Sequence, residues 1–475
     1  MPKSFYYLAG RILVGIGQLV MIRVLTSVLN PVEIGKYYLL MSMVGIVSLF
    51  LITPVLMYIS RHFYGWHRSG IAWSMIKKFF VFLLVVSACS ALVLLVLKPF
   101  HLVGDPLSYG SLCVFIPLLI IGGTMSGYPQ ELLNIIGKSR TFVLLNNLEL
   151  WGKIGVICLF AMLFPPIAMT VLGALTAWSL VFSIIAGTAL YSCVKDVEKK
   201  NVFTFTGFRD IFNFAWPFSI AAGFYWCQTD GYRFVLQDAS GLEAVGKFVV
   251  GFTLGATPVL ALEGLFQQLY LPIFYKEIST ETIESHTAAW NKYAQKVVRV
   301  FIPCALYAAF ASPFLAHWLL HSTYWNVGIY AAFGAISQLF RIFSGTLTNG
   351  MIARKQTQAM LLPNLVGAVV VLAGTFFLAA KNPMIGTGIA LVLSYIAVSI
   401  GLYFKLSNKM RIQFPFADIL KSIMFIAPVC IVLAVSSRFG MATVPFLNIA
   451  VLLITGLSLL YIQYKLSKDV WLFAG

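Results

Sequence analysis

Apolar residues dominate this chain in runs of roughly 20 residues, and short polar segments separate the runs. A run of that length crosses a bilayer as an α-helix, because lipid offers no hydrogen-bond partner to a backbone group. The pattern therefore predicts an all-α polytopic membrane protein with about fourteen transmembrane helices. We place the spans at 8–29, 37–60, 79–98, 110–130, 142–164, 167–193, 211–235, 245–271, 298–320, 325–349, 359–380, 384–405, 416–437 and 443–465.

Composition supports this interpretation. Of the residues, 60% are hydrophobic and only 10% are charged, and the mean hydropathy is +0.89. A soluble domain needs more charge to cover its surface. The formal net charge of +17 does not indicate a nucleic-acid partner, because the basic residues are spread thinly between apolar spans. Arginine interrupts the first run, which also lacks a small-residue cleavage site, so we interpret it as a helix and not as a signal peptide.

The basic residues predict the orientation of the chain. Most of the 33 Lys and Arg residues fall into alternate connections between the spans, and such connections face the cytoplasm. With both termini in the cytoplasm, the outer side holds only Lys36, Lys98, Arg233, Lys247, Lys381 and Arg438. Four further basic residues lie within spans: Arg11, Arg23, Lys153 and Arg341.

A sequence pattern near the N-terminus returns about 210 residues later. Arg23 recurs as Arg233, and Glu33-Ile34-Gly35-Lys36 recurs as Glu243-Ala244-Val245-Gly246-Lys247. The connection NIIGKSR at 134–140 also resembles NGMIARK at 349–355. Correspondences in one order predict two similar lobes.

Each lobe holds six helices, so a pseudo-twofold axis along the membrane normal relates the two lobes. We predict an N-lobe at 1–195, a cytoplasmic linker at 196–210, a C-lobe at 211–405, and two extra helices without a counterpart at 406–475.

Charged residues inside apolar spans are costly, so they are candidates for function. Glu149 and Lys153 are four residues apart on one predicted helix, and Asp230 and Arg233 are three residues apart on another. Pairs at these spacings either neutralise each other or belong to a site. The sequence leaves both alternatives open.

Other intramembrane charges have no partner nearby in the sequence. Glu263 and Arg341 either pair across helices of the C-lobe or face the space between the lobes. Arg11 and Arg23 either reach the lipid headgroups or contact a substrate. The recurrence of Arg23 as Arg233 favours function.

The unpaired intramembrane charge is mostly positive, which suits an anionic substrate such as a phosphate or pyrophosphate headgroup. Glu149, Asp230 and Glu263 are candidates to bind a coupling ion, H⁺ or Na⁺. The seven cysteines have no metal-site spacing, and His317 and His321 lack a third ligand, so we expect neither a cofactor nor a metal. Short outer connections leave no room for a catalytic domain, so we expect no enzyme.

The segments LTSVLNPVEIGKYYLL at 25–40, SGLEAVGKFVVGF at 240–252 and NIIGKSR carry a resemblance to a known family. The chain resembles the Wzx-type polysaccharide flippases of the multidrug/oligosaccharidyl-lipid/polysaccharide (MOP) exporter superfamily. The resemblance covers the first twelve spans and rests on a diffuse pattern, in which a basic first helix is followed by L-x-P-x-E-x-G-x-Y.

The resemblance implies a function. It implies a cationic cavity between two lobes and a cargo of undecaprenyl-pyrophosphate-linked oligosaccharide, such as an O-antigen unit of lipopolysaccharide. The cargo would move to the outer leaflet of the bacterial inner membrane by alternating access. Family members use cavity arginines on helices 1, 2 and 7, which correspond here to Arg11, Arg23, Arg61 and Arg233; Lys153 and Arg341 complete our predicted cationic site. Implied partners are a polysaccharide polymerase and chain-length machinery.

Two other functions stay open. A drug or organic-cation exporter of the same superfamily would need acidic residues to hold a cation, and the basic bias argues against it. A membrane-embedded glycan polymerase or ligase would need large outer loops. O-antigen flippases commonly have twelve spans, whereas this chain has fourteen. Flippases of peptidoglycan precursors and other surface-polysaccharide transporters therefore remain alternatives.

Overall fold

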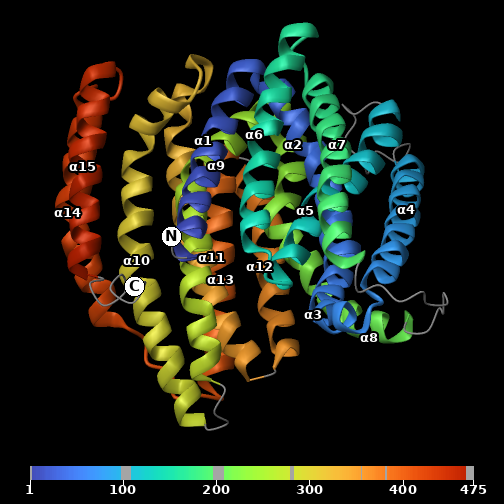
Figure 1. Cartoon of the computed structure of the whole chain (residues 1–475). Helices are drawn as coiled ribbons and strands as arrows, with labels where there is room; N and C mark the ends of the chain where they lie inside the picture. Colours follow the sequence, from blue (N-terminus) through green and yellow to red (C-terminus); the bar gives the residue numbers. More distant parts are fainter. Residues whose placement is uncertain are drawn as a thin grey trace. The chain divides into compact units, whose positions relative to one another are not determined.

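The computed structural model describes residues 3–97, 109–195, 208–278, 283–354, 356–379 and 382–466, and every element in these ranges is helical (Figure 1). The elements up to residue 231 are α1 (Lys3–Val28), α2 (Pro31–Val47), η1 (Ser48–Ile52), α3 (Thr53–Ser69), α4 (Ala72–Leu97), η3 (Ser111–Phe115), α5 (Ile116–Ile135), α6 (Ser139–Leu163), α7 (Ala168–Val194), α8 (Phe208–Trp226) and η5 (Cys227–Gly231). The later elements are α9 (Tyr232–Glu277), α10 (Ile283–Leu319), η6 (Ser322–Val327), α11 (Gly328–Ala353), η7 (Thr357–Met360), α12 (Leu361–Ala379), α13 (Pro383–Ser407), α14 (Phe416–Arg438) and α15 (Pro445–Leu466).

Within the described ranges, the predicted spans lie on helices apart from a few residues at their ends. In the described ranges, 12 helical stretches are long and apolar enough to cross a membrane, and Ile12–Val28 of α1 is a shorter apolar stretch. One of the 12, Phe218–Glu277, covers two predicted spans. The backbone at Gly241 has a φ of 77°, which is not helical, and this kink separates the two spans. The prediction of an all-α polytopic membrane protein with about fourteen helices is confirmed.

Local chemistry explains where these helices begin and bend. Asn30 caps α2, with its side chain accepting a hydrogen bond from the Glu33 backbone N–H, and Pro31 occupies the first turn, where no N–H is needed. The wide helical turns η1 and η3 lie just before Pro54 and Pro117. Proline cannot donate a backbone hydrogen bond, so the preceding turn widens.

The chain divides into two compact units, one of residues 1–17 and 28–234 and the other of residues 18–27 and 235–475. In the first unit α5 packs against α7 and α6, and α8 packs against α3. Most of the predicted linker, residues 196–207, lies outside the described residues. The border between the units follows η5, and the predicted limits of the two lobes stay a prediction.

In the second unit, glycines allow α9 and α11 to pack at backbone distance. A Cβ atom on Gly255 would overlap the backbone carbonyl of Ala331, and one on Gly334 would overlap that of Phe252. Small residues let membrane helices approach closely in this way. The close approach brings the charged side chains of the two helices within reach of each other.

The two C-terminal helices, α14 and α15, lie beside α10 (Figure 1). Buried Phe314 of α10 belongs to the same apolar cluster as Leu433 and Ile462. Polar contacts add to this packing. Arg299 of α10 pairs with Asp418 of α14 at 2.7 Å, and Asn448 and Gln463 of α15 donate hydrogen bonds to backbone oxygens of α10. The extra helices therefore belong to the second unit.

Candidate functional site

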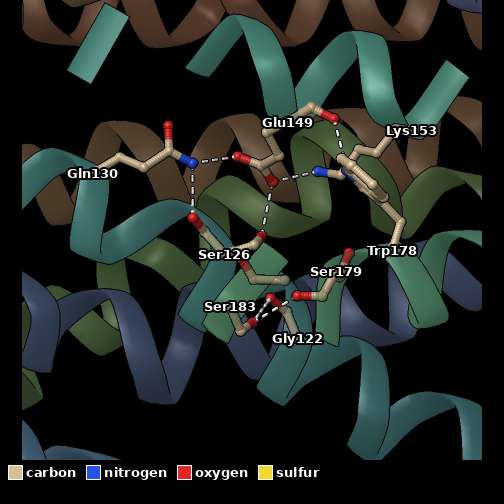
Figure 2. A network of polar contacts seen from close by, with 9 residues as sticks. Gly122, Ser126, Gln130, Glu149, Lys153, Trp178, Ser179 and Ser183 are labelled. Carbon is tan, nitrogen blue, oxygen red and sulfur yellow. Dashed lines mark hydrogen bonds and ion pairs between the residues drawn. The ribbon is translucent and has the colours of Figure 1, made fainter. Parts of the chain in front are cut away.

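Glu149 of α6 lies at the centre of a buried polar network (Figure 2). Its Oε1 atom accepts hydrogen bonds from Ser126 Oγ at 2.7 Å and from Lys153 Nζ at 2.6 Å. Its Oε2 atom accepts a hydrogen bond from Gln130 Nε2 at 2.6 Å. The carboxylate therefore meets three donors, one of them charged.

Helical spacing and close packing build this network. Glu149 and Lys153 are one turn apart on α6, and Ser126 and Gln130 are one turn apart on α5. Trp178 of α7 donates from Nε1 to the Glu149 backbone oxygen at 3.0 Å. The Trp178 ring lies where a Cβ atom on residue 152 would be, so glycine there lets α7 pack onto α6. Three helices meet at this carboxylate.

A second network surrounds Arg233 at the start of α9. Arg233 Nη1 pairs with Asp230 Oδ1 at 2.6 Å and donates to Ser42 Oγ of α2 at 2.8 Å. The guanidinium also lies over the Tyr38 ring, 5.3 Å from its centre. Trp226 of α8 donates to the Ser42 backbone oxygen at 2.9 Å. These contacts link α2 to the end of α8 and to the start of α9.

A third network joins α9 to α11 in the second unit. Arg341 Nη2 pairs with Glu263 Oε2 at 2.6 Å, and Gln338 Nε2 donates to the same oxygen at 2.9 Å. Arg341 Nε donates to Gln338 Oε1 at 2.9 Å, and Gln267 Nε2 donates to Glu263 Oε1 at 2.9 Å. Of the two alternatives that the sequence left open for Glu263 and Arg341, the structure shows pairing across helices of one unit.

The remaining predicted site residues lie outside these networks. Arg23 is exposed on α1 and has no ion-pair partner among the described residues. Arg61 is exposed on α3. The side chain of Arg11 lies outside the described residues. The substrate-binding and ion-coupling roles of all these residues stay predictions.

The ring of His317 makes contacts within the protein. Its Nδ1 atom lies 2.8 Å from the Pro313 backbone oxygen, and its ring stacks on Trp325 with 4.9 Å between centres. Within the described ranges, no group of three His, Cys, Asp or Glu side chains is placed to hold a metal ion.

Glu33 has a role that the sequence analysis missed. Its Oε1 atom pairs with Lys36 at 2.7 Å, and its Oε2 atom accepts a hydrogen bond from the backbone N–H of Ala168 at 2.8 Å. Ala168 is the first residue of α7, so a carboxylate stabilises the positive end of that helix. In the repeat, Glu243 pairs with Lys247 at 2.7 Å on the surface. In the first unit, the glutamate of the repeated Glu–Gly–Lys pattern thus serves helix packing.

The uncharged members of the networks, Ser126, Gln130 and Gln338, were also missed. All three lie within predicted membrane spans, and polar residues one turn apart were the available signal. That signal does not say which helix the side chains meet.

Comparison with known proteins shows the fold. No family model and no curated protein matches the chain. Among solved structures, the lipid II flippase MurJ in an inward closed conformation matches with a TM-score of 0.66 and 16% identity, over 98% of this chain and 99% of that one. An inward-facing MATE family transporter of the MOP superfamily matches with a TM-score of 0.56 and 13% identity, over 86% of this chain and 95% of that one.

A further match is a MOP superfamily transporter from Pyrococcus furiosus, with a TM-score of 0.56 and 13% identity over 86% of this chain and 97% of that one. Identities this low show the fold alone. These structures are described as a flippase and as transporters. The chain is a multi-pass membrane protein with the fold of the MOP superfamily transporters.

Proposed function

We propose that this chain is a flippase for an oligosaccharide linked to undecaprenyl pyrophosphate, such as an O-antigen or other surface-polysaccharide unit. It moves the cargo from the cytoplasmic to the outer leaflet of a bacterial inner membrane. The protein opens alternately toward each side, and an ion gradient drives the cycle. Both termini are cytoplasmic in this proposal, because the basic connections then face the cytoplasm.

The distribution of charge carries the proposal. Glu149, Asp230 and Glu263 are each paired with a cation at 2.6 Å. Arg23 is exposed within an apolar helix and has no ion-pair partner among the described residues. The charge left for a ligand is therefore positive, and arginine binds phosphate through two parallel hydrogen bonds.

The same observation weighs against an exporter of organic cations. Such a ligand needs an acidic side chain, and the three candidate acids are already neutralised by Lys153, Arg233 or Arg341. The MATE transporters share the fold, so the exporter stays the second candidate.

Similarity to the lipid II flippase supports the choice in a second way. Because it covers 98% of the chain, that match includes α14 and α15, the helices that the Wzx-type resemblance did not explain. MurJ is described as a flippase for lipid II.

Deletion of the gene tests the function. We expect surface glycan to be lost and complete lipid-linked repeat units to accumulate on the cytoplasmic leaflet, where mass spectrometry of the trapped unit identifies the cargo. Expression of the protein from a plasmid should restore surface glycan and remove the accumulated lipid-linked units. Normal surface glycan together with new sensitivity to cationic dyes would contradict the flippase and favour drug export.

A further inference from the structure

We propose that Glu149 and Lys153 form a proton-controlled binding site for a phosphate oxyanion, an inference that rests on the proposed function. In this site Lys153 exchanges its partner. It pairs with Glu149 when the carboxylate is ionised and with the oxyanion when the carboxylate is protonated.

The structure shows the pair intact. Lys153 Nζ lies 2.6 Å from Glu149 Oε1, and the Lys153 side chain is 26% exposed while that of Glu149 is 11% exposed. Lysine is therefore the more accessible partner of the pair. While the pair is intact, the lysine charge is neutralised and attracts an external anion weakly.

The surroundings of Glu149 already hold what a protonated carboxyl needs. A carboxylic O–H requires an acceptor, and Ser126 Oγ lies 2.7 Å from Oε1. The Ser126 hydroxyl has a second acceptor, the Gly123 backbone oxygen at 3.2 Å. Rotation of one hydroxyl hydrogen therefore turns Ser126 from a donor to Glu149 into an acceptor from it. No heavy atom needs to move.

Gln130 provides a second unused acceptor. Its side chain is 1% exposed, and its Oε1 atom is buried without a hydrogen-bond partner in the described structure. A buried acceptor of this kind is costly unless another state of the protein satisfies it. In the structure Gln130 turns its Nε2 atom to Glu149, so its Oε1 atom becomes an acceptor for a protonated carboxyl only when the side-chain amide turns over.

Among the described contacts, the network around Glu263 has neither a hydroxyl that can change from donor to acceptor nor a buried, unoccupied amide oxygen. There Gln338 Oε1 accepts from Arg341 Nε, so it is occupied. The donors to Glu263 are the side-chain nitrogens of Arg341, Gln338 and Gln267. Nitrogen donors of this kind cannot become acceptors by rotating a hydrogen. Of these two networks, only the one at Glu149 is equipped for two protonation states.

No other charge among the described contacts competes for the proton. The side chains that face the carboxylate are Ser126 and Gln130 from α5 and Lys153 from α6, and α7 contributes Trp178. From α1, Gly10 and Gly17 approach α6 near Glu149, and the Arg11 side chain lies outside the described residues. Protonation of Glu149 therefore leaves the lysine charge unpaired, and a lysine ammonium binds phosphate as a point charge.

Linkage makes this inference measurable. If the oxyanion binds the form with protonated Glu149, its binding takes up about one proton, and affinity rises about tenfold for each unit that pH falls while the carboxylate is ionised in the free protein. Oxyanion binding and proton binding favour each other by the same factor.

The experiment is titration calorimetry of the purified full-length protein in phosphatidylcholine nanodiscs. Inorganic pyrophosphate is the first probe, and two buffers of different ionisation enthalpy give the number of protons taken up. Farnesyl pyrophosphate and nanodiscs containing phosphatidylglycerol then distinguish a free anion, a lipid-linked pyrophosphate and a phospholipid headgroup as the source of the oxyanion.

Variants separate this site from general charge effects. Glu149→Gln should bind pyrophosphate at every pH with about one proton less taken up than the wild type. Lys153→Met should lose binding, and Lys153→Arg should restore it together with the proton uptake. The control is Glu243→Gln, which removes the acid of an exposed Glu–Lys pair with the same spacing and should behave like the wild type. Thermal unfolding of each variant checks that it is folded.

Two results would overturn the inference: equal proton uptake in the wild type and Glu149→Gln, or pyrophosphate binding that Lys153→Met leaves intact. Failure of the proposed function is seen separately, as normal surface glycan after gene deletion.

Discussion

Uncharged side chains determine what a buried charge can do in this protein. Glu149 and Glu263 both pair with a cation at 2.6 Å, yet their neighbours differ. Ser126 beside Glu149 is able to donate or accept, whereas Gln338 beside Glu263 has both of its polar atoms engaged. Single hydroxyl and amide groups thus separate a site with two states from a fixed cross-link.

At the scale of single residues, the prediction concerns Arg23. Replacing it by alanine should lower surface glycan in a complemented deletion strain by about tenfold or more, because one charge-assisted hydrogen bond contributes about 1.5–3 kcal/mol. The measurement is surface glycan per cell at equal protein level. Arg438→Ala is the control, since Arg438 is an exposed arginine in the last turn of α14. Wild-type glycan in Arg23→Ala would remove this residue from the cationic site.

At the scale of helices, the contact between α9 and α11 depends on glycine. Gly255 and Gly334 each meet a backbone carbonyl of the other helix at a distance that leaves no room for a Cβ atom. That approach allows Arg341 to reach Glu263 across the helix pair. Close packing and the buried ion pair therefore support each other.

Gly255→Ala should destabilise the protein. The added methyl group would overlap the Ala331 carbonyl, and overpacking of this kind costs about 1–3 kcal/mol. The midpoint of thermal unfolding in detergent, followed by tryptophan fluorescence, measures the effect. Gly345→Ala on α11 is a matched control, because a Cβ atom there meets nothing within 4 Å. An equal midpoint for the two variants would contradict the role assigned to Gly255.

At the scale of the whole molecule, the orientation in the membrane follows from many weak signals together. Each basic connection contributes little, but the alternation along the chain predicts that both termini are cytoplasmic. The 12 long apolar stretches, with the break at Gly241 and the shorter stretch in α1, agree with the even number of crossings that this orientation needs.

Fusion proteins test the orientation. Alkaline phosphatase, which is active only outside the cytoplasm, should be inactive when fused after Leu466. It should be active when fused at Gly440, in the turn between α14 and α15. A fluorescent protein fused at the two positions should give the opposite pattern. Active phosphatase after Leu466 would reverse the proposed topology.

The sequence alone predicted the class of fold and nearly all of its helices, because an apolar run in lipid has only one way to pair its backbone groups. It also predicted the pairs Glu149–Lys153 and Asp230–Arg233 as one of two alternatives, since residues three or four apart share a helix face.

Only the tertiary structure decided which helices meet. It brought Arg341 to Glu263, gave Glu33 to the first turn of α7, and placed Ser126 and Gln130 around Glu149. These contacts depend on how helices pack, through glycines and large side chains far apart in the chain. A local pattern of apolar and polar residues determines that a helix forms and which of its residues share a face, whereas the partner of that face is set by the shape of the other helices.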